Sequence, residues 1–262
     1  MALRVTVASG FGEIASTSQE RKKMTHAYKD FVLPAPSLAH NAHRGIGLHA
    51  AANLLIRIDP CPDMAAGDLL ELFWDDCYVT SHPLKRLEVG RPVFLSIPQS
   101  FPDSRRARIH YRWLRTGHRP RVSETLPVRI KLDCPGGPPL HDDEEENQAL
   151  APVVLPRKLC QHGISARHIA NGIPFTIEPY LNMAPDDEIT LRWGDLRLDL
   201  PVLKAANVGK PVRGKVPATI ILEAGEDDHL ELNYCIIDCV GNSSRWSPPL
   251  NLRVFGLEAP TL

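Results

Sequence analysis

An internal duplication constrains this sequence more than any other feature. Residues 53–98 align with residues 172–217 at a constant offset of 119 residues. Matching residues recur along this stretch: Ile58 with Ile177, Pro60 with Pro179, Met64 with Met183, Asp68 with Asp187, Leu72 with Leu191, Trp74 with Trp193 and Pro98 with Pro217. After a short gap, Tyr111 aligns with Tyr234, and residues 126–130 align with residues 250–254. Because solenoid units are only roughly 20–50 residues long, a repeat of this length indicates a duplicated domain.

Each copy alternates apolar and polar residues with a period of two, which is the pattern of half-buried strands. The inward positions include a matching set in each copy: Leu70, Leu72 and Trp74 in the first, Ile189, Leu191 and Trp193 in the second. The two tryptophans recur at the same pleat position, which favours core packing over an exposed sugar-binding platform. Short alternating strands separated by turn residues predict an all-β chain of antiparallel β-sandwiches.

The segment between the copies has the composition of a linker. Residues 135–150 begin with Pro135-Gly136-Gly137 and include an acidic run at 142–146. Proline and glycine interrupt regular structure, and like charges repel, so we expect this segment to be exposed. The predicted organisation is a flexible tail (1–30), domain 1 (31–134), a linker (135–150) and domain 2 (151–262).

Two motifs carry a resemblance to a known family. The segment 234–254 (YCIIDCVGNSSRWSPPLNLRV) is similar to the last hairpin of bacterial immunoglobulin-like repeats, with its aromatic strand and Asp-x-x-Gly-Asn turn. Residues 64–74 and 183–193 resemble the M-A-x-G-D-x-x-x-L-x-W element of tandem repeats of this kind. The resemblance implies two tandem immunoglobulin-like β-sandwiches in a large bacterial surface or secreted protein, acting as an interaction or spacer module.

The chain departs from these patterns in informative places. The first copy has Arg115-Thr116-Gly117-His118 where the second has the Asp-x-x-Gly-Asn turn, and Asp186 replaces Gly67. An antibody domain places a cysteine two residues after its tyrosine, but Ile236 and Trp113 stand there. We therefore expect each core to be held by apolar burial and not by an inter-sheet disulfide.

The amino terminus lacks the apolar segment of a secretory signal, which predicts a cytoplasmic protein, a leaderless export route or a leader already removed. No stretch approaches 18 consecutive apolar residues, so we expect no membrane span. The six cysteines could form three bridges in a secreted chain, but free thiols are the favoured interpretation.

Sequence motifs for catalysis or metal binding are absent. The chain has no nucleophile elbow, P-loop, dinucleotide fingerprint or HExxH motif, and no CxxC pair. We therefore predict a non-enzymatic chain with no cofactor and no metal site, and with an unidentified protein or glycan as its partner. An enzyme with a site between the two domains remains an alternative.

Charge is distributed unevenly although the net charge is only −1. Residues 105–121 contain seven arginines and no acid. Alternation places four cations on the outer surface of two strands that should pair as a hairpin. This predicted basic face consists of Arg108, Arg112, Arg129 and Lys131. It motivates a second function, the binding of a polyanion or nucleic acid by domain 1, whereas neutralisation by nearby acids is the alternative.

Overall fold

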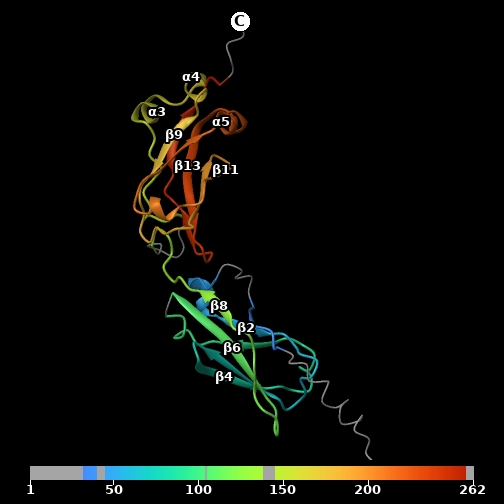
Figure 1. Ribbon diagram of the computed structural model, residues 1–262. Helices are drawn as coiled ribbons and strands as arrows, with labels where there is room; N and C mark the ends of the chain where they lie inside the picture. The colour runs from blue at the N-terminus through green and yellow to red at the C-terminus, as the bar shows by residue number, and fades with distance from the viewer. Residues whose placement is uncertain (1–31, 40–44, 104, 138–144, 258–262) are drawn as a thin grey trace, which may run out of the picture.

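The computed structural model describes residues 32–39, 45–103, 105–137 and 145–257. Two separate apolar cores account for the architecture, and Figure 1 shows them as two bodies arranged end to end. The first core contains buried residues from Leu33 to Ile130, and the second contains buried residues from Leu150 to Val254. The predicted tail and the middle of the predicted linker lie outside the described residues, so the domain bounds stay a prediction.

Domain 1 is a sandwich of two antiparallel sheets. One sheet has the order β1-β2-β5, and the other has the order β4-β3-β6-β7, with β8 also pairing with β6. Its elements are β1 (Ser37–Leu38), α2 (Leu48–Ala52), β2 (Leu55–Ile58), β3 (Leu69–Trp74), β4 (Cys77–Pro83), β5 (Val93–Ser96), β6 (Arg106–Leu114), β7 (Arg121–Val122) and β8 (Leu126–Arg129). Asp75 and Asp76 both have positive φ, which suits the two-residue turn between β3 and β4.

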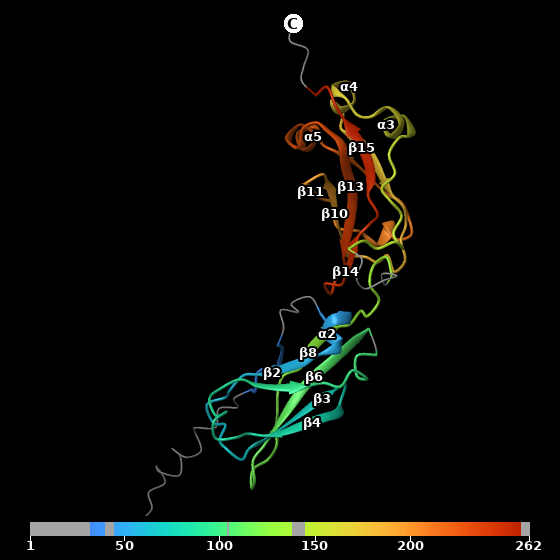
Figure 2. The same ribbon diagram turned by 180° about the vertical axis from the view of Figure 1, so that it is seen from behind.

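Domain 2 repeats this arrangement. A two-stranded β12-β9 sheet faces a sheet of order β11-β10-β13-β14, with β15 also pairing with β13. The strands are β9 (Ile173–Ile177), β10 (Glu188–Trp193), β11 (Leu196–Asp199), β12 (Val212–Val216), β13 (Asp227–Ile237), β14 (Ser243–Trp246) and β15 (Leu250–Val254). Short helices α3 (Arg157–His162), α4 (Ala166–Ile169), α5 (Ala218–Ala224) and the 3-10 turn η1 (Ala205–Asn207) complete it. Helices α3, α4 and α5 lie at the end remote from domain 1 (Figure 2).

The predicted fold class is confirmed: both domains are immunoglobulin-like antiparallel β-sandwiches. In each, the tryptophan-bearing strand pairs with the tyrosine-bearing strand, with Leu72 opposite Tyr111 and Leu191 opposite Tyr234. The matching tryptophans are buried in both cores. Burial of a large apolar side chain contributes about 1.5–3 kcal/mol before the entropy cost, so these repeated inward positions hold each sandwich together.

The predicted exposure of the linker is wrong at its start and only partly right at its far end, where Asn147 and Leu150 are buried but Glu145, Gln148 and Ala149 are exposed. Pro135, Gly136 and Gly137 are buried, and the Gly136 N–H donates to the Leu181 carbonyl oxygen. At the far end the buried Asn147 side chain donates to the carbonyl oxygens of Gly137 and Ser244. The acidic residues 142–144 lie outside the described residues. The linker ends are therefore hydrogen-bonded to backbone carbonyl groups of domain 2, which the composition of the linker did not indicate.

None of the helices in the described part of the chain is long and apolar enough to cross a membrane.

Candidate functional site

Three residues of the predicted basic face lie where alternation places them. Arg108 and Arg112 on β6, and Arg129 at the end of β8, are exposed on the outer surface of the same sheet. Arg108 lies opposite Pro127, and Arg112 lies opposite Glu71. Domain 1 thus presents guanidinium groups to solvent.

Arg112 is held against an aromatic cluster. Its guanidinium lies 4.6 Å from the centre of the Phe73 ring. The same ring stacks on His110 at 5.0 Å and meets the edge of Tyr78 at 6.0 Å. Burial lowers the pKa of His110, so this imidazole is neutral at neutral pH. The neighbouring side chains of this cluster cover the Phe73 ring, and Arg112 is one of the groups that shield the ring from solvent.

Arg106, Arg108 and Arg129 line a shallow hollow over the paired strands β6 and β8. This hollow has a volume of about 540 Å³ and is lined by Asp75, Arg106, Ala107, Arg108, Pro127, Val128 and Arg129. Arg106 and Arg129 are directly opposite each other in the ladder. Arg112 belongs to the neighbouring aromatic cluster, so the predicted face consists of separate parts.

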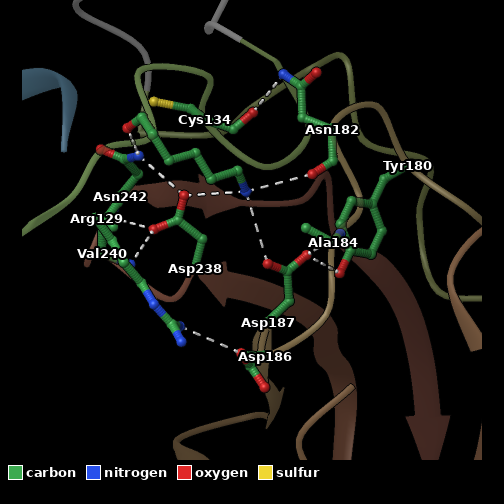
Figure 3. Close-up of polar contacts among 11 residues, drawn as sticks. Arg129, Cys134, Tyr180, Asn182, Ala184, Asp186, Asp187, Asp238, Val240 and Asn242 are labelled. Atoms are coloured by element: carbon green, nitrogen blue, oxygen red, sulfur yellow. Dashed lines mark hydrogen bonds and ion pairs between the residues drawn. The ribbon is translucent and has the colours of Figure 1, made fainter. Parts of the chain in front are cut away.

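Lys131 was predicted to be exposed on this face, and that prediction is wrong. Its side chain is only 18% exposed because it reaches across to the carboxylates of Asp187 and Asp238 in domain 2, both of which are labelled in Figure 3. The ammonium Nζ lies 3.1 Å from Asp238 Oδ2 and 3.8 Å from Asp187 Oδ1. It also donates to the Asn182 carbonyl oxygen at 3.4 Å. Alternation correctly turns Lys131 out of its own core, but the surface it meets there is the other domain.

The Asp-x-x-Gly-Asn turn of domain 2 builds the other half of this junction. Asp238 Oδ1 accepts the backbone N–H groups of Val240 and Asn242, which closes the turn. The Asn242 amide then bridges the domains, since its Nδ2 donates to the Lys131 carbonyl oxygen at 2.8 Å. Its Oδ1 accepts the Leu48 N–H, also at 2.8 Å. The Asp-x-x-Gly-Asn turn is therefore a docking element in this chain.

Asp187 supplies the second buried carboxylate of the junction. Its side chain is fully buried, and burial raises its pKa. Tyr180 Oη and the Ala184 N–H both donate to Asp187 Oδ2, so Lys131 is the cation that faces its other oxygen. A buried carboxylate without such a cation would be costly. The raised pKa of Asp187 therefore has a structural cause, and the group is enclosed by the junction.

In the matching turn of domain 1, the Asp68 carboxylate is neutralised by a cation of the same domain. Asp68 Oδ2 accepts the Ala65 N–H as Asp187 accepts that of Ala184, but its cation is Arg115 of the same domain. Arg115 and Asp238 occupy matching positions, because each lies four residues after the matching tyrosine. This charge reversal between the copies is the signal that could have located the junction in the sequence.

A wider hollow of about 920 Å³ lies beside the junction. Its polar lining includes Arg105, Arg106 and Arg129 from domain 1 and Asn182 and Asp186 from domain 2. Arg129 and Asp186 approach to 3.8 Å, with both side chains mostly exposed, so their ion pair is weak. The lining does not include Asp187, whose carboxylate is turned toward Lys131. Across the described residues, no three histidine, cysteine, aspartate or glutamate side chains gather as a metal site.

No protein-family model matches the chain, and no curated protein matches it either. Among solved structures it is similar to the fibronectin(III)-like modules of Clostridium thermocellum CbhA, with 10% identity and a TM-score of 0.43 over 87% of this chain and 96% of that one. It is also similar to part of a 1.5-MDa bacterial ice-binding adhesin, with 11% identity and a TM-score of 0.35 over 81% of this chain. This chain spans 61% of that adhesin structure. A two-domain fibronectin type III segment of chicken tenascin matches at 11% identity and a TM-score of 0.25, over 83% of this chain and 95% of that one.

Proposed function

We propose that this chain is a non-enzymatic interaction or structural module that holds two immunoglobulin-like domains in one relative orientation. The observation that carries the proposal is the buried ion cluster of Lys131, Asp187 and Asp238 at the junction. A flexible spacer would not bury three charged groups, because each is stable there only while its partners stay in place. The Asn242 amide adds two further hydrogen bonds between the domains.

The setting that we propose is a bacterial surface, secreted or secretion-associated system. The support is the resemblance of the Asp-x-x-Gly-Asn hairpin and of the repeated tryptophan element to tandem bacterial repeats. Fractionation of the source cell tests this setting. Recovery of the chain from the envelope or the medium is expected, and confinement to the cytosol would contradict the proposed setting.

The fixed orientation can be tested with the native thiols. Cys77 in domain 1 and Cys160 in domain 2 are exposed, whereas burial raises the thiol pKa of the other four cysteines. A spin-label reagent used in limited amount at neutral pH should therefore react first at the two exposed sites. Double electron–electron resonance should then give one narrow distance distribution. A broad, continuous distribution would overturn the rigid junction, and Cys77→Ser and Cys160→Ser are the labelling controls.

A second candidate function is the binding of an anionic partner by domain 1. Arg108, Arg112 and Arg129 support it, because all three are exposed on one sheet. Replacing Arg108 and Arg112 by Glu should reduce retention on an anionic column, and the effect should diminish with added salt. Unchanged retention of the folded double variant would indicate that these residues only form a solvated edge, whose charge repulsion resists aggregation.

A further inference from the structure

The outer edge of strand β5 exposes backbone hydrogen-bonding groups. β5 is the last strand of the sheet β1-β2-β5. The Ile97 N–H donates to the Leu54 carbonyl oxygen, and in this register alternate residues of β5 bond to β2. The N–H and C=O groups of Phe94 and Ser96 therefore point away from the sheet. In the described part of the chain, no strand pairs with β5 on this side.

Two prolines limit the length of this open edge. Pro92 and Pro98 flank β5, and proline has no backbone N–H to donate. Phe94 and Ser96 are therefore the residues of this edge that offer both a donor and an acceptor. An antiparallel partner of about five residues, centred on Leu95, satisfies all of these groups.

Domain 2 offers an internal comparison at the matching strand. β12 is also the last strand of its sheet, and there Arg213 and Lys215 match Phe94 and Ser96 at the offset of the repeat. Charged side chains, lysine above all, protect sheet edges from pairing with other strands. β5 has no such charge, and Phe94 is 53% exposed. The edge of domain 2 is thus protected by its sequence, whereas the edge of domain 1 is open to a partner strand.

The amino-terminal segment of this chain has the residue pattern that such an edge requires. Leu3, Val5 and Val7 alternate there with Arg4 and Thr6. Alternation with a period of two, together with β-branched residues, favours a strand. Residues 3–7 lie outside the described residues, so their pairing is inferred from their sequence and from the edge that they would meet.

An antiparallel pairing with Val5 opposite Leu95 matches the two segments residue by residue. On the core side it would form three apolar pairs: Val7 with Val93, Val5 with Leu95 and Leu3 with Ile97. On the solvent side, Thr6 and Arg4 would lie opposite Phe94 and Ser96 and exchange backbone hydrogen bonds with them. A shift by one residue would turn Arg4 and Thr6 toward the core, so the pattern specifies this register.

We propose that residues 3–7 add to the free edge of β5 of the same chain as an antiparallel strand. This inference goes beyond the proposed function, because it assigns an intramolecular docking surface to domain 1. The connecting residues 8–31 can span up to about 80 Å, whereas a domain of this size has a radius of gyration of only about 13 Å. Attachment to the same chain gives an effective concentration on the order of millimolar, which favours this segment over that of a second copy.

Amide hydrogen exchange of the full chain at dilute concentration tests this pairing. The Phe94 and Ser96 amides should be protected, whereas the outward amides of the β12 edge should exchange rapidly. Val5→Asp/Val7→Asp turns two carboxylates toward the core, which is costly. Exchange at Phe94 and Ser96 should therefore accelerate by about tenfold or more in this variant.

The matched control adds the same charge elsewhere in the amino-terminal segment. Ala15→Asp/Thr17→Asp has the same spacing but lies outside residues 3–7, so it should change these exchange rates less than about twofold. Rapid exchange at Phe94 and Ser96 in the unmodified chain, or equal rates in the two variants, would overturn the proposal.

A disulfide cross-link tests the register and identifies the occupant. With the exposed native thiols removed by Cys77→Ser/Cys160→Ser, Arg4→Cys/Ser96→Cys places two Cα atoms about 5.5 Å apart, within the range of a disulfide. Mild oxidation should give a disulfide within one chain, and Arg4→Cys/Lys215→Cys, at the matching place on β12, should stay reduced. A disulfide between two chains would assign the edge to a second copy and overturn the proposal, as would equal cross-linking at both edges. Thermal melting of each variant confirms that the domains remain folded.

Discussion

Asp68 and Asp187 occupy the same position of the repeat, but different charged groups surround the two carboxylates. Each caps the turn before the tryptophan-bearing strand by accepting a backbone N–H three residues earlier. Asp68 also accepts the Arg115 guanidinium and the Trp113 indole N–H. Asp187 accepts a hydrogen bond from the Tyr180 hydroxyl of its own domain, and the Lys131 ammonium of the other domain lies 3.8 Å from its second oxygen. A single charge reversal, Arg115 against Asp238, thus decides whether the carboxylate is neutralised within its domain.

The Arg115 hydrogen bonds lower the pKa of Asp68 to about 2. Since this carboxyl titrates at about 3.9 when unfolded, it contributes stability above that pH and loses it as the pH falls through about 2. We predict that Asp68→Asn lowers the free energy of unfolding at neutral pH by about 2 kcal/mol. Urea denaturation of both proteins should show this difference shrinking between about pH 4 and pH 2.

Asp63→Asn is the matched control, because the Asp63 side chain is exposed in the same loop. It should change stability by less than about 0.5 kcal/mol. A loss in Asp68→Asn that stays constant down to pH 2 would show that packing, and not the ionised carboxylate, stabilises this turn.

The closing strand of each sandwich is interrupted at a matching serine. Tyr111 donates its backbone N–H to Ser123 Oγ at 3.0 Å, and Tyr234 donates its own to Ser247 Oγ at 3.2 Å. Each serine hydroxyl then donates to a carbonyl oxygen of the following residue. The serine side chains thus extend the ladder where the strand leaves it, between β7 and β8 and between β14 and β15.

We predict that Ser247→Ala lowers the stability of domain 2 by about 1–3 kcal/mol, because the buried N–H of Tyr234 loses its acceptor. Amide hydrogen exchange at Tyr234 should accelerate in the variant. Ser243→Ala, at an exposed serine of β14, is the control and should leave that exchange rate unchanged. Full protection of the Tyr234 amide in Ser247→Ala would contradict the bridging role of the hydroxyl.

A set of polar contacts joins the two domains. Lys131 is surrounded by Asp187, Asp238 and the Asn182 carbonyl oxygen. Asn182 also donates to the Cys134 carbonyl oxygen at 2.9 Å (Figure 3). Such contacts are directional, so they specify one orientation as well as holding the domains together.

We predict that Lys131→Met weakens the contact between the two domains, so that their relative orientation is no longer fixed. Removing one member of a buried ion cluster leaves two carboxylates uncompensated, which costs about 3–5 kcal/mol. The distance distribution between labels on Cys77 and Cys160 should therefore broaden. Lys85→Met removes an exposed lysine of domain 1 and should leave the distribution narrow.

A second substitution that neutralises one of the remaining buried carboxylates should restore the fixed orientation of the domains. Adding Asp187→Asn to Lys131→Met removes one buried charge and should narrow the distribution again. If Lys131→Met alone keeps the narrow distribution, the ion cluster does not control the orientation of the domains.

The duplication and the period-two alternation were sufficient to predict two sandwiches and their inward residues. Trp74, Tyr111 and their counterparts in domain 2 are buried as expected. Arg108, Arg112 and Arg129 are exposed as expected. These properties are local, because alternation decides which side of a strand a side chain occupies.

What covers the outer side of a strand was decided by tertiary structure alone. Alternation turned Lys131 outward, yet its ammonium is enclosed by carboxylates that lie 56 and 107 residues later in the chain. The Pro/Gly segment was expected to be exposed, and the approach of domain 2 buried it. Both differences have one physical reason. The free energy of placing a charge or a backbone group depends on the partners that surround it in space, and residues distant in the sequence supply those partners.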